Sequence, residues 1–415
     1  MTTTGTGRLP IGWRFMVWRE WRLLWRRPVL LTLTVIYPLI LMLVLILVFQ
    51  AGVPQKLPVA VLDQDNSDLS RQLLQAVAAT PEIAITASVH DLRQGRALIQ
   101  AGRVRGLLYL PQHLERDLLA GHRPEVVFFY DNQWMSTGGI VARGVMQAFT
   151  EVTAQMRVAL RMAQGESMAH AAMAAQPVQV QASPLFNPAL NYVHFLLAAL
   201  LPAVLQIFIA STTAYALGLD VQTRYRLRVM RRLAGGVWSA VLGKLLPYTV
   251  VFLLVFAVAD GILFGLLGVP LRGSLTVLLV AAVAFVLASQ LIGALVVLLV
   301  RNISTALSLV AVLMAPAFGF MGIGFPREGM NLFSQLWGYL IPGTWFMQIR
   351  VDQTVRGTPW EVTLWPLLGL LVMVTLLAGL VFLRLMVWQR PWLQTRTTLR
   401  AKSAASAADE GASMP

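Results

Sequence analysis

The chain has 415 residues, of which 57% are apolar and only 13% are charged. Soluble proteins carry about 25% charged residues, and a soluble core could not bury this much apolar surface, so the composition excludes a soluble enzyme. No cysteine is present, which excludes disulfides, thiolate metal sites and cysteine catalysis. The formal net charge of +14 would suit a nucleic-acid partner only if the basic residues were arranged for one.

Residues 1–28 predict an amphipathic helix on the cytoplasmic surface of a membrane. Two sets of side chains recur at i, i+3 and i+7, namely Arg19, Arg22 and Arg26, and Trp18, Trp21 and Trp25. One helix would therefore carry a cationic face and an aromatic face, which favours an interfacial helix on anionic lipid. The alternative is a simple positive anchor that sets the topology.

Six nearly uncharged runs are long enough to cross a bilayer, which takes about 20 residues. They cover residues 29–49, 191–217, 245–268, 274–300, 303–322 and 362–383. The sequence thus predicts a polytopic α-helical membrane protein with six transmembrane helices. One helix lies at 29–49, and the other five belong to a transmembrane domain over 189–390.

Residues 50–188, between the first two spans, predict an extracytoplasmic α/β domain with a long helix. Apolar strand-like runs alternate with helical patterns, which is typical of such a domain. The expected strands are 58–62, 83–86, 104–110 and 125–130, and the expected helices are 69–79, 89–101, a helix ending at 119, and 139–164. Residues 169–183 read as a return linker.

The basic residues lie mainly on one side of the predicted topology. The termini, the loop 218–244 and Arg301 together hold 18 basic and 4 acidic residues, whereas the other side holds 15 of each. Loops rich in Lys and Arg stay in the cytoplasm, so both termini are expected there. The net charge is explained by topology, and no nucleic-acid partner is predicted.

A helix is expected at 220–236, in the loop between the second and third spans. Leu227, Met230 and Ala234 recur at i, i+3 and i+7, so the helix can rest on its apolar stripe. The arginines would then project into the cytosol as a docking surface for a cytoplasmic partner, made of Arg224, Arg226, Arg228, Arg231 and Arg232. The alternative is a topology determinant that contacts only lipid headgroups.

The segment 325–359 predicts two short outer half-helices, 332–341 and 344–351, separated by Pro342 and Gly343. Each is too short to cross the membrane. Four aromatic residues there suit the membrane interface, namely Trp337, Tyr339, Trp345 and Phe346. The tail 391–415 is expected to be cytoplasmic and partly disordered.

Asp260 is the one carboxylate that this reading places inside a span, and Gln206 and Gln290 in other spans are counted with it as candidates for a substrate or proton path. A charge in the membrane is costly and suggests a substrate or proton path, although a structural role is the alternative. No phosphate-binding loop is present: Leu245 follows Gly243-Lys244, and Trp238 stands where the first glycine is needed. No metal-ligand spacing or nucleophile motif is found either.

Several local motifs occur in a specific order. They are Val59-Ala60-Val61-Leu62-Asp63-Gln64-Asp65-Asn66-Ser67, Leu185-Phe186-Asn187-Pro188, Gly243-Lys244-Leu245-Leu246-Pro247-Tyr248 and Ile341-Pro342-Gly343-Thr344. Together with the span order, residues 12–390 resemble the permease subunits of type-2 ABC exporters, in the branch with a large periplasmic domain. One departure is that the family's acidic coupling segment is replaced here by Thr223-Arg224-Tyr225-Arg226.

The resemblance implies a permease that is not itself an enzyme and that moves an amphiphilic or drug-like molecule outward. It implies cytoplasmic ABC ATPase subunits as partners, which would bind the ATP and magnesium and couple to the arginines of 220–236, and a second permease copy or paralogue. A periplasmic membrane-fusion protein is a further expected partner, and the expected location is a bacterial inner membrane. Two alternatives stay open: a mechanotransmission subunit without a substrate path, and an ion-coupled carrier.

Overall fold

The computed structural model describes residues 12–120, 122, 124–132, 135–163, 165, 167–168, 185–187, 190–222 and 224–412. Within these, the side chains of 135–136, 160, 224–228 and 388–412 are not described. The expected linker 169–183 lies outside the described residues. The chain forms two compact units, one made of residues 1–50 with 190–415 and the other of residues 51–189.

The helical unit contains six helices that are long and apolar enough to cross a membrane. They are Pro28–Phe49 (α2, η1 and α3), Val193–Val221 (η2 and α9), Val237–Gly265 (α11), Leu275–Val300 (α12), Ile303–Phe320 (α13 and α14) and Trp360–Val387 in α17. The chain is therefore a polytopic membrane protein. Five spans begin within two residues of the expected positions, but α11 begins eight residues before Leu245 and so includes Gly243 and Lys244.

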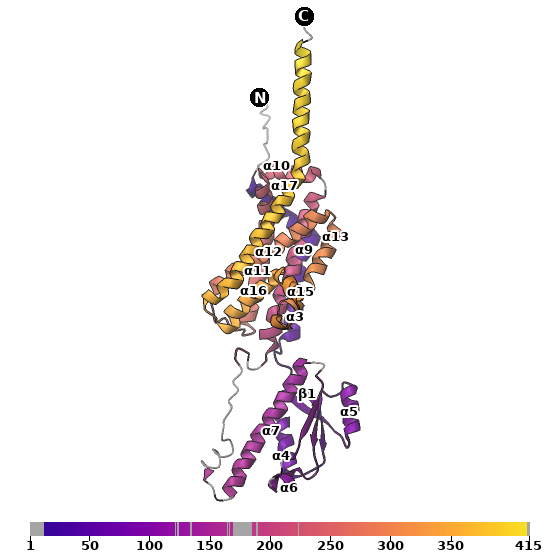
Figure 1. Ribbon diagram of the computed structural model, residues 1–415, viewed down its shortest axis with the longest axis vertical. Helices are drawn as coiled ribbons and strands as arrows, with labels where there is room; N and C mark the ends of the chain where they lie inside the picture. Colours follow the sequence, from indigo (N-terminus) through magenta and orange to yellow (C-terminus); the bar gives the residue numbers. More distant parts are fainter. Residues whose placement is uncertain are drawn as a thin grey trace. The chain divides into compact units, whose positions relative to one another are not determined.

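The core of the helical unit lies around α12, which packs between α9 and α17 (Figure 1). The rings of Phe256, Phe285 and Phe346 meet at its centre, with centroids 4.7–6.0 Å apart. α9 and α12 come unusually close at Gly293, where a Cβ would lie 2.1 Å from the carbonyl oxygen of Ala210. Small residues at helix contacts let backbones approach in membranes, and Gly293 serves this purpose.

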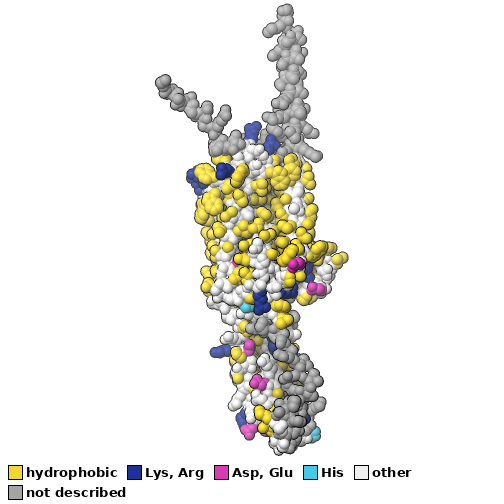
Figure 2. Space-filling model, turned by 90° about the vertical axis from the view of Figure 1, so that its left-hand side faces the viewer, with side chains coloured by type: hydrophobic (Ala, Val, Ile, Leu, Met, Phe, Trp, Pro, Cys, Tyr) yellow, Lys and Arg dark blue, Asp and Glu magenta, His cyan; other side chains and the backbone are white. Residues whose placement is uncertain are grey.

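The outer helices leave their apolar side chains exposed. Examples are Leu43 on α3, Val312 on α13 and Leu376 on α17, all more than half exposed. Figure 2 shows these hydrophobic side chains over most of the visible face of the helical unit, with Lys and Arg at the end near α10. Such a surface is suited to lipid rather than to water.

The short helices lie where the sequence predicts them, with two differences. The half-helices are α15 (Leu332–Tyr339) and α16 (Pro342–Val351), followed by a π-helical turn η4 (Asp352–Arg356). Phe346 is fully buried in the core, so it is not an interface aromatic. α17 (Trp360–Ala412) is helical over the described part of the tail that the sequence predicts to be partly disordered, and its Ala, Arg and Lys residues have high helix propensity.

The second unit is a four-stranded sheet covered by helices. Its strands are β1 (Leu57–Asp63), β2 (Ile83–Ser88), β3 (Gly106–Leu110) and β4 (Val127–Tyr130), in the order β2-β1-β3-β4. β1 is parallel to β2 and β3, and β4 is antiparallel to β3. Its helices are α4 (Asp68–Ala78), α5 (Leu92–Gln100), α6 (Leu114–Leu119) and α7 (Met135–Ala163).

The two faces of this sheet follow the alternation of side chains along β1. Val59 and Val61 pack with residues of α4 and α7, whereas Ala60 and Leu62 pack with residues of α5. Because both faces are covered, β1 and β3 read as nearly continuous apolar runs in the sequence.

Candidate functional site

The basic helix α10 (Arg224–Ala234) packs against α1 (Trp13–Arg26) and the start of α11. Met230 and Ala234 are buried there, in contact with Met16 and Ala240. The amide of Gly12 also donates to the carbonyl of Leu233 at 2.8 Å. The apolar stripe predicted from the sequence therefore holds α10 against two other helices.

The arginines of α10 are described only in part. Arg232 is exposed and Arg231 is half-buried. The side chains of Arg224, Arg226 and Arg228 lie outside the described residues, so their role in coupling stays a prediction.

The close contact between α1 and α11 depends on Gly243. A Cβ at this position would lie 2.8 Å from Cβ of Met16 and 2.9 Å from the carbonyl oxygen of Trp13. Both distances are shorter than normal van der Waals contact, and the second is to backbone, which cannot rotate away. Gly243 therefore allows the two helices to touch, and it places the neighbouring Lys244 beside α1.

Lys244 is the centre of a buried charge cluster that joins α1, α9 and α11. Its Nζ lies 2.9 Å from Oε2 of Glu20 and 2.7 Å from Oδ2 of Asp220. Arg19 donates from Nη2 to Oδ1 of Asp220 at 2.8 Å, and the hydroxyl of Tyr248 donates to Oε2 of Glu20 at 3.2 Å. Lys244, Glu20 and Tyr248 are all fully buried.

The cluster is electrically neutral, because the carboxylates of Glu20 and Asp220 are matched by the cations of Lys244 and Arg19. Glu20 lies on the inward face of α1 with Met16 and Leu24, so folding of the helix necessarily buries it. A single buried charge without a partner costs several kcal/mol. Glu20 and Asp220 are therefore stable here only while Lys244 and Arg19 stay in place, which fixes α1 to α9 and α11.

Arg19 differs from the outward position that the sequence predicts. Its guanidinium turns inward to Asp220, because one lysine is shared between two carboxylates and Asp220 takes a second cation. Burial alone would lower the pKa of Arg19, but the hydrogen bond to Asp220 and the charges of Asp220 and Glu20 raise it, so Arg19 keeps its charge.

The rest of α1 keeps its aromatic and cationic surface. Trp18, Trp21 and Trp25 are exposed, and so are Arg22 and Arg26. The guanidinium of Arg22 lies 3.8 Å from the ring centroid of Trp18, so these two side chains share one face instead of lying on separate ones.

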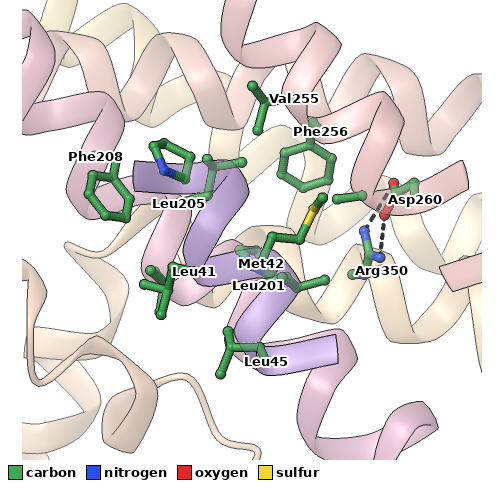
Figure 3. A pocket seen from close by; sticks show the side chains of 14 residues that line it. Leu41, Met42, Leu45, Leu201, Leu205, Phe208, Val255, Phe256, Asp260 and Arg350 are labelled. Atoms are coloured by element: carbon green, nitrogen blue, oxygen red, sulfur yellow. Dashed lines mark hydrogen bonds and ion pairs between the residues drawn. The ribbon is translucent and has the colours of Figure 1, made fainter. Parts of the chain in front are cut away.

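Asp260 is paired with a buried arginine from the half-helix α16 (Figure 3). Nη2 of Arg350 lies 2.5 Å from Oδ1 of Asp260, and Nη1 lies 3.2 Å from Oδ2. Only 1% of Arg350 is exposed. The prediction that Asp260 is the one carboxylate within a span is wrong. α9 extends to Val221 and therefore includes Asp220.

Gln206 and Gln290 lie apart from Asp260 in the described structure. Oε1 of Gln206 accepts a hydrogen bond from the amide of Gly343 at 3.2 Å, which attaches α9 to the start of α16. Gln290 accepts from the hydroxyl of Thr249 at 2.9 Å and donates to the carbonyl of Leu245 at 3.4 Å. Neither glutamine lines the cavity at Asp260.

Sequence reasoning missed Glu20, Asp220, Tyr248 and Arg350, and it counted Lys244 with the cytoplasmic loop. The available signal for Glu20 was its spacing of four from Met16 and Leu24. Among the described residues, no group of three or more His, Asp or Glu side chains could hold a metal ion. The chemistry of this region is therefore that of buried ion pairs between helices.

Comparison with known proteins defines the class. Residues 28–384 match the family described as ABC-2 family transporter protein. The match covers most of the chain, so the protein belongs to the ABC-2 family and is a transport permease with several membrane-spanning helices.

Two relatives come from Escherichia coli (strain K12). The probable multidrug ABC transporter permease YbhS is 24% identical over 378 residues, covering 88% of this chain and 94% of YbhS. The inner membrane transport permease YhhJ is 24% identical over 323 residues, covering 74% of this chain and 79% of YhhJ. The similarity to both relatives therefore extends over most of the chain.

Proposed function

We propose that this chain is the permease subunit of an ATP-driven exporter that moves amphiphilic or drug-like molecules out of the cytoplasm or the inner leaflet. Family membership and the six membrane-spanning helices support a transport role. The substrate class is supported by the description of YbhS as a probable multidrug permease.

The proposed orientation places α1 and α10 in the cytoplasm and the α/β unit outside it. The excess of basic residues at the termini and in the loop before α11 supports this orientation. The name of YhhJ supports an inner-membrane location. The aromatic and basic surface of α1 would then face anionic lipid headgroups.

The proposed partners are cytoplasmic ABC ATPase subunits and a second permease copy or paralogue. ATP and magnesium would bind to the ATPase subunits, since the sequence of this chain has no phosphate-binding loop. The arginines of α10 would meet an acidic surface on the ATPase. The α/β unit is the proposed contact for a periplasmic membrane-fusion protein.

The observation that carries the proposal is the position of α10 on the charge cluster. Because α10 packs on α1 and α11, a force applied to α10 acts on both helices. Lys244, Glu20 and Asp220 join these helices to α9 through buried ion pairs. ATPase motion would in this way reach three helices at once rather than one loop.

The two alternatives have less support. An ion-coupled carrier needs a free ionisable group near mid-membrane, whereas Asp260 is paired with Arg350 and lies only five residues before the end of α11. The mechanotransmission subunits resemble this chain less, because they usually have four spans, whereas the described residues contain six helices that are long and apolar enough to cross a membrane.

The test is to reverse charge on α10 in the assembled transporter. Replacing Arg224, Arg228 and Arg231 together by Glu should abolish coupling of ATP hydrolysis to export in proteoliposomes, because like charges would then face the ATPase. A matched control replaces Arg14, Arg22 and Arg26 by Glu, which makes the same charge change on α1. Normal export by a correctly inserted α10 variant would refute α10 as the coupling surface.

A further inference from the structure

A small cavity lies beside Asp260 and Arg350, between α3, α9, α11 and α16 (Figure 3). Its volume is about 30 Å³, which is room for one small polar group and too little for a whole drug-like molecule. Apart from this ion pair, its lining side chains are apolar, among them Met42 and Leu201. The ion pair therefore forms the polar end of an apolar cavity.

The ion pair has unused hydrogen-bonding capacity. A carboxylate can accept about four hydrogen bonds, and Asp260 accepts two, both from Arg350. Nε of Arg350 is buried without a partner in the described structure. An occupant of the cavity would thus be favoured if it carried both donors and an acceptor, and if it were neutral overall, as the pair itself is.

Aromatic rings enclose the guanidinium of Arg350, so its position does not depend on Asp260 alone. Its guanidinium lies 5.7 Å from the ring centroids of Phe256 and Phe264 and 6.0 Å from that of Phe346. Asp260 is less enclosed, with 17% of its side chain exposed compared with 2% for Arg350. The carboxylate is therefore the part of the pair that a ligand reaches first.

The cavity lies at the depth of lipid headgroups. α11 has 29 residues and is about 44 Å long, which exceeds the ~30 Å hydrocarbon core of a bilayer. Asp260 lies about 8 Å from the end of α11, so it is level with the core boundary when the helix is centred. Leu45, Val204 and Phe208 line the cavity and are only half-buried, which leaves it open at the side of the bundle.

We propose that this cavity binds the headgroup of a zwitterionic phospholipid with N–H donors, of the phosphatidylethanolamine kind. The ammonium group enters the cavity and donates to the free acceptor sites of Asp260, and the phosphate stays at the open side of the cavity, near Leu45, Val204 and Phe208. The acyl chains extend from this open side along the apolar, lipid-facing surface of the bundle. The charges of the ligand and of the pair are complementary, and the ammonium matches the size of the cavity.

The test measures lipid retention by native mass spectrometry of the purified full chain in detergent. Phosphatidylethanolamine and phosphatidylcholine with identical acyl chains differ only in the methyl groups that remove the N–H donors. The wild type should retain phosphatidylethanolamine about tenfold more tightly, as expected for hydrogen bonds to a charged group. Equal retention of the two lipids, or tighter retention of phosphatidylglycerol, would refute the proposal.

The first variant is Asp260→Leu with Arg350→Met, which removes the polar groups without leaving an unpaired buried charge. It should lose the preference for phosphatidylethanolamine. The control is Asp352→Leu with Arg356→Met, because this pair lies on the next helical turn and does not line the cavity. The control should keep the wild-type preference, and a preference that survives in the first variant would refute the proposal.

The second variant tests the shape of the cavity and keeps the ion pair. Met42→Trp should fill the cavity and abolish the preference, whereas Leu43→Trp, on the exposed face of the same helix, should not. Equal behaviour of these two variants would refute the site. The readout is binding, so its result is separate from whether the chain exports a substrate.

Discussion

Lys244 and Glu20 form a fully buried ion pair, with Nζ and Oε2 2.9 Å apart, between a membrane-spanning helix and the N-terminal helix. The pair turns the N-terminal helix from a surface element into part of the helical core. Its strength can be measured because each partner has a polar or apolar substitute of similar size.

Lys244→Met should lower the free energy of unfolding by about 3 kcal/mol, because it removes the cation that Glu20 and Asp220 share and leaves Glu20 with only Arg19, 3.3 Å away. Adding Glu20→Gln should recover much of this loss, since Arg19 still pairs with Asp220. Denaturant unfolding in detergent micelles measures both. The exposed pair Arg71–Asp68 is a control, for which Arg71→Ala should cost less than about 1 kcal/mol. Equal losses in the single and double variants would show that the two residues do not interact.

Gly243→Ala should destabilise the protein by about 1–3 kcal/mol, since the new Cβ overlaps Met16 and the backbone of Trp13. Gly261→Ala is the matched control on the same helix, because nothing lies within 4 Å of its Cβ position. This control should be neutral or gain about 0.5–1 kcal/mol from helix propensity. Thermal unfolding of the two variants tests the contact, and similar melting temperatures would contradict it.

Cysteine labelling tests the proposed orientation, and the natural chain contains no cysteine that could interfere. Ser88→Cys and Arg232→Cys both place the thiol at an exposed position. An impermeant maleimide added to cells with a permeable outer membrane should label position 88 and not position 232. Disrupting the inner membrane should expose both, and the opposite pattern would invert the topology.

Asp352 should make stability depend on pH in a specific direction. Burial raises its pKa more than the hydrogen bond from Arg356 lowers it. The folded protein therefore binds the proton more tightly than the unfolded chain, and the cost of burying the charge disappears as the pH falls through the raised pKa. Asp352→Asn should be more stable than the wild type at about pH 7, and the difference should shrink toward about pH 4. A constant difference over this range would contradict the assignment.

The membrane spans and the strands could be predicted because each depends on a local pattern. Uncharged runs such as 274–300 are long enough to identify a span without knowledge of its neighbours. The strand at Leu57–Asp63 is apolar on both faces, as a strand covered on both sides must be. The tail after residue 390 is predicted to be partly disordered because it has few bulky apolar residues, and its described residues continue the helix of the last span because many of them favour a helix.

The ion pairs could not be predicted in the same way. Glu20 and Asp220 count as ordinary acids near the membrane surface until folding brings both to Lys244. Asp260 could be recognised as a costly charge, but its partner Arg350 lies in a half-helix far along the chain. Partners of this kind are set by which helices pack together, and no periodic pattern in the sequence records that packing.

α11 carries one buried ion pair near each of its ends. Lys244 and Asp260 are about 24 Å apart along its axis, and Pro247 lies between them. Pro247 has no amide hydrogen for the carbonyl of Gly243, so α11 lacks one backbone hydrogen bond just beyond the charge cluster. A helix bends most easily where such a bond is missing, so a displacement at α10 would be divided between bending of α11 at Pro247 and movement of α16, which Arg350 attaches to α11.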